Sequence, residues 1–213
     1  MNKLVMGGAT APRRLTQKGN EMIEFGLLAM MMVPLFGGMF YSGLGLIRAN
    51  QAHQVGRDVN SMYIKGIDFS QTVNKTLAMR LAGGLDLQLS GGHGLLILSQ
   101  VIYIGPLTGP ICLATIASGQ ACANHDSFVF TQRINIGDTS LYTSDLGNPS
   151  APVNGGGIVQ NYASNVGAAL PNQTGFRSRW QTPLVEGQSV YVTETYFTSL
   201  NPGGAPVHTY SYF

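Results

Sequence analysis

The feature that most constrains this chain is a run of 23 residues, 25–47, that contains no Asp, Glu, Lys, Arg or His. At about 1.5 Å per residue, a helix of this length spans roughly 34 Å, enough to cross a bilayer core of about 30 Å. The run is also far longer than the roughly 7–15 apolar residues of a cleaved secretory signal, which makes that alternative the weakest. We therefore expect a membrane-inserted helix.

Charge around the run is asymmetric. Lys3, Arg13, Arg14 and Lys18 all precede Asn20, and no acidic residue does. Positive charge beside an apolar segment stays on the cytoplasmic side, so we expect a single-pass protein with a cytoplasmic N-terminus and a C-terminal domain outside. The remaining cations form no cluster on the rest of the chain, which argues against nucleic-acid binding.

Several residues inside the run bear on its shape and packing. Pro34 removes one helical hydrogen bond and predicts a kink unless neighbours compensate. Gly37, Gly38 and Gly43 are small positions that would let another helix approach closely in lipid. Gly is also simply commoner in membrane helices than in soluble ones, so both interpretations stay open.

Beyond Ile47 the pattern becomes amphipathic. Apolar residues recur at spacings of three and four, namely Ala49, Ala52, Val55, Val59 and Met62. This spacing predicts that the helix continues to about Lys65, with Gly66 ending it. A second, shorter helix is expected over 70–81, with Val73, Leu77 and Leu81 on one face.

Strand patterns follow after Gly91-Gly92, and they are expected over 95–104, 127–136, 190–200 and 207–213. In the second strand, alternation places Phe128, Phe130, Ile134 and Ile136 on one face, opposite Thr131, Arg133 and Asn135. In the third strand, Glu194 interrupts the more apolar face. Residues 138–185 have loop composition with no period, and we expect them to be an exposed surface.

These patterns predict an α+β fold in three parts. A basic leader peptide occupies 1–19, a long transmembrane and amphipathic helix occupies 20–65, and an extracytoplasmic domain with a small antiparallel β-sheet occupies 66–213. Cys112 and Cys122 are the only cysteines. In an exported domain they would form one disulfide that braces a loop, whereas in the cytosol they would be two thiols, so compartment decides between these possibilities.

Residues that could carry chemistry are sparse. The four histidines are scattered without metal-ligand spacing, and His125-Asp126-Ser127 are adjacent in sequence rather than a constellation. No nucleophile elbow, P-loop, dinucleotide fingerprint or CxxC is present. We therefore expect no catalytic residues, no metal, no cofactor and no small-molecule substrate.

Glu24 lies at the very start of the apolar helix. An acid at the centre of a membrane helix costs about 2.5–3.5 kcal/mol and less near the interface, so it needs either a partner or a polar layer. One interpretation places it in the headgroup layer, where the helix N-terminus also favours an anion. The other gives it a cationic partner.

The order of a basic leader, Gly19, four residues, Glu24-Phe25 and a long apolar helix resembles the class III signal of type IV pilins and pseudopilins. The sequence Glu-Phe-Gly-Leu-Leu-Ala at 24–29 is similar to that of the TadE-like family of minor pseudopilins, which belong to tight-adherence pili. The resemblance covers about residues 13–60. Asn20 stands where major pilins usually have Phe.

The resemblance implies that a prepilin peptidase cuts between Gly19 and Asn20, that Glu24 becomes the fifth-position acid, and that it pairs with a new N-terminal amine in the assembled filament. It also implies residence in a bacterial inner membrane before assembly, and other pilin subunits as partners. Removing residues 1–19 from 213 leaves 194 residues. Because major subunits of tight-adherence pili are little more than a helix, the implied role is that of a minor pilin in pilus assembly, adhesion or secretion.

A different class of protein fits the same anchor. A signal-anchored extracytoplasmic domain with a binding or hydrolytic activity would keep its membrane helix uncleaved and never enter a filament.

Overall fold

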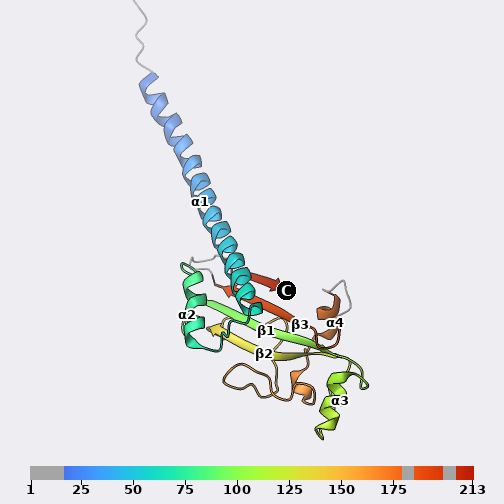
Figure 1. Cartoon of the computed structure of the whole chain (residues 1–213). Helices are drawn as coiled ribbons and strands as arrows, with labels where there is room; N and C mark the ends of the chain where they lie inside the picture. The colour runs from blue at the N-terminus through green and yellow to red at the C-terminus, as the bar shows by residue number, and fades with distance from the viewer. Residues whose placement is uncertain (1–16, 179–184, 199–204) are drawn as a thin grey trace, which may run out of the picture. The chain divides into compact units, whose positions relative to one another are not determined.

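The computed structural model describes residues 17–178, 185–198 and 205–213, with side chains described from Glu21 onward (Figure 1). The chain divides into two compact units, one ending at Gly45 and one running from Leu46 to Phe213. The elements are helices α1 (Gln17–Ile64), α2 (Thr72–Leu81), α3 (Pro110–Ala117) and α4 (Gln173–Ser178), a 3₁₀ turn η1 (Val166–Ala168), and strands β1 (Gly94–Ile104), β2 (Ser127–Gly137), β3 (Ser189–Phe197) and β4 (Val207–Tyr212). A long apolar helix followed by a four-stranded antiparallel sheet confirms the expected α+β class.

Helix α1 ends as its sequence predicts. Gly66 has φ +86°, a left-handed conformation that glycine adopts without steric cost. The N–H of Ile67 donates to the carbonyl of Met62 at 3.1 Å, and the N–H of Gly66 donates to that of Tyr63 at 3.0 Å. These two bonds form a Schellman cap, which satisfies carbonyls that the end of the helix would otherwise leave unpaired.

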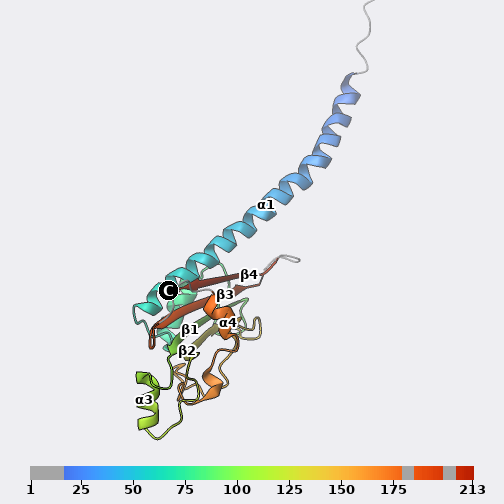
Figure 2. The ribbon, with the colours of Figure 1, turned by 90° about the vertical axis from the view of Figure 1, so that its right-hand side faces the viewer.

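The second unit is built on a sheet of order β2-β1-β3-β4, with every neighbouring pair antiparallel. Residues 46–64 of α1, together with α2, cover one face of it. Ala52, Val55 and Val59 of α1 are buried there, as the amphipathic pattern predicts. The opposite face belongs to a second core cluster that includes Val101, Phe130 and Val192. In both views α3 lies at the far end of this unit from β4 (Figure 1 and Figure 2).

The predicted faces of the strand at 127–136 are wrong. Register in β1 passes from Gln100 to Val101 while its partner in β2 skips from Gln132 to Phe130, leaving Thr131 as an extra residue. Such a β-bulge inverts the side-chain alternation on either side of it. The four apolar residues expected on one face are therefore divided between the two core clusters, Ile134 and Ile136 in one and Phe128 and Phe130 in the other.

The long segment after β2 is not the exposed loop that its composition predicts, because much of it forms a layer over the second face of the sheet. Leu146, Val159 and Leu170 are buried in the same cluster as Phe130. Isolated bridges join Val159 to Val153 and Ala169 to Val129. The buried residues are spaced irregularly among Gly, Asn and Pro, so the layer has no periodic signal that a sequence pattern could reveal.

Helix α2 confirms the second helix predicted from the sequence. Val73, Leu77 and Leu81 are exposed, Val73 by 78%, whereas the small residue Ala78 is fully buried against the domain. The predicted strands are all present; Leu200, at the end of the third, lies outside the described residues.

Gly56 lies where α1 packs tightly against the sheet. A Cβ atom at this position would lie 3.1 Å from Cγ2 of Thr195 and 3.6 Å from Oγ1 of Thr209. A larger side chain would therefore push the helix away from β3 and β4. Gly56 lowers the intrinsic helix propensity of this segment, but its lack of a side chain allows α1 to pack closely on β3 and β4.

We predict that Gly56→Leu lowers the free energy of unfolding of the second unit by about 1–3 kcal/mol, because overpacking forces the helix and strands apart. Thermal unfolding of the full chain, followed by near-ultraviolet circular dichroism of its tyrosines, would measure this. Gly43→Leu on the same helix is the control, since nothing lies within 4 Å of a Cβ there. Equal effects of the two substitutions would contradict the packing argument.

Candidate functional site

The apolar part of α1 is exposed along its length. Met22 is 80% exposed, Phe25 75% and Phe40 72%, and none of the most apolar window of the helix is buried. The core helix of a soluble protein would instead be mostly covered. Among the described residues, one helix, near the N-terminus, is thus long and apolar enough to span a membrane. Exposed apolar surface of this extent is typical of segments that contact lipid or other apolar chains.

The predicted processing residues lie at the start of this helix. Gly19 and Asn20 have helical backbone within α1, but their side chains, like all of residues 1–16 of the leader, lie outside the described part. The carboxylate of Glu24 is exposed. Because Asn20 and Glu24 are four residues apart on one helix, they occupy the same face one turn apart.

Pro34 lies inside α1, and the residues on both sides of it remain helical. The three glycines singled out in the sequence, Gly37, Gly38 and Gly43, have nothing within 4 Å of the point where a Cβ atom would lie. No part of the described chain fills the space beside them. Any packing role of these glycines is therefore toward lipid or another molecule.

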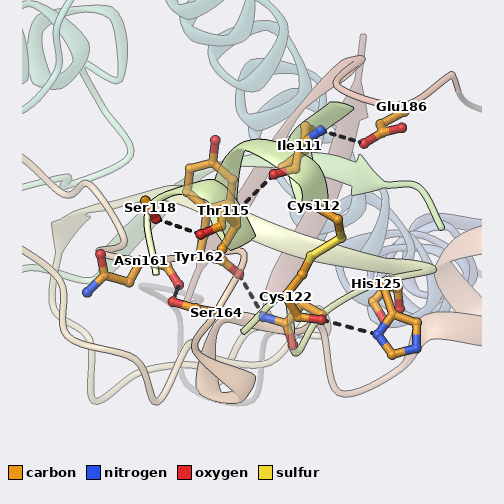
Figure 3. Close-up of a disulfide and its surroundings, with 12 residues drawn as sticks. Ile111, Cys112, Thr115, Ser118, Cys122, His125, Asn161, Tyr162, Ser164 and Glu186 are labelled. Atoms are coloured by element: carbon orange, nitrogen blue, oxygen red, sulfur yellow. Dashed lines mark hydrogen bonds between the residues drawn. A yellow bond between two sulfur atoms is a disulfide. The ribbon is translucent and has the colours of Figure 1, made fainter. Parts of the chain in front are cut away.

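Cys112 and Cys122 are joined in a disulfide, with Cα atoms 5.2 Å apart (Figure 3). Cys112 lies on α3, a helix in a segment whose sequence reads as loop. Gly109 at the N-cap and Pro110 at the first helical position are the signals that could have revealed this helix. Both half-cystines are buried and belong to the core cluster that includes Phe130.

The carboxylate of Glu186 caps α3 from a distant part of the chain. Its Oε1 accepts a hydrogen bond from the backbone N–H of Ile111 at 3.0 Å. The Oε2 atom lies against the backbone of Gly105 and Gly109, where a side chain would collide with it. This contact fixes the segment before β3 to the start of the disulfide-bonded helix.

A buried ion pair crosses the sheet, and the sequence patterns did not reveal it. Arg133 on β2 and Glu194 on β3 are 6% and 1% exposed, with Nη1 and Oε2 3.7 Å apart. The guanidinium also donates to Oγ of Ser99 at 2.5 Å and to Oδ1 of Asn148 at 2.9 Å. The interruption of an apolar strand face by Glu194 is the one available signal, because a buried acid requires a partner.

The loop over the sheet completes this network. Oγ of Ser144 donates to Glu194, the N–H of Asp145 donates to its other oxygen at 3.0 Å, and the carbonyl of Gly147 accepts from Arg133 at 2.9 Å. Burial lowers the pKa of Arg133 to about 10 against the opposing effect of Glu194. Burial also raises the pKa of Glu194, although Ser144 and Arg133 oppose the change. These hydrogen bonds hold the loop at 144–147 against strands β2 and β3 of the sheet.

The residues that could have carried chemistry in the sequence lie as follows. Among residues 21–178, 185–198 and 205–213, no group of three or more His, Cys, Asp or Glu side chains could hold a metal ion. His125 is directed to the carbonyl of Cys122, with Nδ1 3.2 Å from that oxygen, and Ser127 donates to the backbone carbonyl of His125 rather than to its ring. These neighbours do not form a nucleophile and base.

Comparisons with protein-family models, with curated proteins and with solved structures find no match to this chain. Its own residues are therefore the basis for a functional proposal.

We predict that replacing both cysteines by serine lowers the free energy of unfolding by roughly 2–3 kcal/mol, the loop-closure stabilisation typical of a short disulfide loop. Chemical denaturation of the full chain with and without a reducing agent would measure it. The reducing agent should destabilise the native chain and leave the doubly substituted variant unchanged. A native chain that is insensitive to reduction would contradict the prediction.

We predict that substitutions of Arg133 and Glu194 have non-additive effects on the free energy of unfolding. Arg133→Met or Glu194→Leu alone leaves one buried charge unpaired and should cost about 3–5 kcal/mol. The double variant removes both charges and should cost clearly less than the sum of the two, as measured by a double-mutant cycle on chemical denaturation. Additive costs would show that the two side chains stabilise the domain independently.

Proposed function

We propose that this chain is a minor pilin-like subunit, similar to the TadE-like family, that is inserted in a bacterial inner membrane, processed between Gly19 and Asn20, and assembled through its N-terminal helix. The observation that carries the proposal is the exposed apolar helix, which begins with a helical Gly19-to-Glu24 segment and continues without a break to a helical segment packed on an antiparallel sheet. The protein then acts in pilus assembly, adhesion or secretion rather than in catalysis.

In this proposal the apolar helix lies in two environments in succession, first the lipid bilayer and then the filament core. Before assembly, lipid covers side chains such as Phe25 and Phe40. In a filament, the helices of neighbouring subunits replace the lipid. The open space beside Gly37, Gly38 and Gly43 supports this, because another helix could approach closely there without displacing any part of the chain.

Cleavage gives Glu24 a partner. Cutting after Gly19 removes the four leader cations and creates an α-amino group on Asn20. That amine lies one helical turn from the carboxylate of Glu24, and equivalent amines of neighbouring subunits come near it once the helices bundle. In a low-dielectric filament core, pairing offsets the cost of burying both charges.

The second unit supports a role outside the cell membrane. Its disulfide is of the kind that persists in oxidising compartments such as the periplasm or cell surface. A basic leader that stays in the cytoplasm would place the unit from Leu46 onward on the opposite side of the membrane, in the periplasm or outside the cell. A domain of this size exceeds what a helix-only major subunit carries, which favours a minor subunit.

The processing test is co-expression with a prepilin peptidase, followed by intact-mass measurement. The expected product lacks residues 1–19 and begins at Asn20, and Gly19→Leu should abolish the cut. Gly26→Leu is the matched control within the helix and should be processed normally. A product that still begins at Met1 would favour the signal-anchored domain instead.

Assembly is tested separately from processing. Glu24→Ala should be cut normally yet be missing from sheared pili, because the buried amine loses its partner. Glu21→Ala, which removes a neighbouring exposed carboxylate from the same helix, should be incorporated as in the native protein. Normal incorporation of Glu24→Ala would remove the proposed ion pair.

A further inference from the structure

A pocket of about 540 Å³ opens between α3 and the loop at 161–164, beside the disulfide. Figure 3 shows Ser118, Asn161 and Ser164 gathered on one side of that bond. The volume lies within the range of small-molecule sites in proteins, roughly 300–1,000 Å³. Its ten lining residues come from α3 and the segment just after it on one side, and from 161–164 on the other.

The two walls of the pocket are held in a fixed relation. The fully buried side chain of Asn124 donates to the carbonyls of Tyr162 at 2.7 Å and Asn165 at 2.6 Å. At the rim, Oγ of Ser164 donates to Oε1 of Gln120 at 2.9 Å. The disulfide fixes the α3 side at Cys112. These links connect both walls to the same short segment after α3, so the pocket is preformed.

The chemistry of the lining favours neutral ligands over ionic ones. None of the ten lining side chains is charged. The start of α3 could attract an anion, but the carboxylate of Glu186 already occupies the N–H of Ile111 and adds negative charge there. An anionic ligand would be repelled, and a cationic one would find no carboxylate in the lining.

The remaining polar groups suit a ligand with several neutral hydroxyls. Within the described residues, the amide of Asn161 and the hydroxyl of Tyr162 make no side-chain hydrogen bond, and the Nε2 of Gln120 is likewise unused. Each amide offers both donors and an acceptor, which matches hydroxyl groups that donate and accept. The ring of Tyr162 and the side chains of Ile111 and Ala114 add apolar surface beside them.

We propose that this pocket binds a neutral saccharide. Amides from two walls contact its hydroxyls, and the apolar side chains contact its C–H faces. The site lies entirely in the unit from Leu46 onward and uses none of Gly19, Asn20 or Glu24. Binding therefore does not depend on processing or on filament assembly.

The test is saturation-transfer nuclear magnetic resonance with the full chain in phosphatidylcholine nanodiscs, because glucoside and maltoside detergents carry sugars themselves. The probes are methyl glucoside, lactose and N,N′-diacetylchitobiose, with glucuronic acid as the charged counterpart of glucose. We expect saturation transfer to at least one neutral probe and none to glucuronic acid. Absence of transfer to all three neutral probes, or equal transfer to glucuronic acid, would overturn the proposal.

Two variants locate the binding. Ala114→Arg fills the pocket and should abolish transfer, whereas Ala117→Arg, on the same helix but outside the lining, should leave it unchanged. Asn161→Gly removes one amide while keeping the φ of +51° accessible, and should weaken binding about tenfold. If Ala114→Arg fails to fold, Asn161→Gly still tests whether the pocket is the binding site. Native transfer in both pocket variants would place the binding elsewhere and refute the site.

Discussion

The unit from Leu46 onward depends on the close packing of α1 residues 46–64 against the sheet. Gly56 allows the backbone of the helix to approach Thr195, and the ring of Tyr63 packs edge-on against Tyr191 with centroids 5.1 Å apart. The hydroxyl of Tyr63 also donates to Gln132 at 2.8 Å. One helix segment thereby contacts strands at both edges and in the middle of the sheet, and it supplies the apolar face that a four-stranded sheet needs for stability.

The parts of the fold that could be predicted are those whose secondary structure is determined by residues close together in the sequence. The amphipathic spacing up to Met62 and the glycine at 66 define the end of α1. A continuous apolar, β-branched run locates β1, and alternation helps to locate the later strands. The faces of β2 could not be predicted, because the extra residue Thr131 is recognisable only when the pairing of β1 and β2 is known. Helix α2 could be predicted as an element, but its packing face could not, because its larger apolar residues face outward and Ala78 makes the close contact.

The candidate sites divide in the same way. The apolar helix with Glu24 is visible in the sequence because it is a continuous pattern. The Arg133–Glu194 pair joins residues about sixty positions apart on strands separated by β1, and the pocket joins α3 to a loop about forty positions later. Neither arrangement has a local signature, since each is created by strand order and by buried hydrogen bonds such as those of Asn124.

The strand order has a consequence for how such a chain folds while it is being synthesised. β1 pairs with β2 on one side and with β3 on the other, and residues 138–188 lie between those two partners. While that segment is being made, β1 and β2 can pair and the disulfide between Cys112 and Cys122 can close, yet the second edge of β1 has no native partner. An apolar strand with an unpaired edge can form hydrogen bonds with strands of other chains, which leads to aggregation. The second edge of β1 therefore stays exposed until β3, more than fifty residues after the end of β2, is available to pair with it.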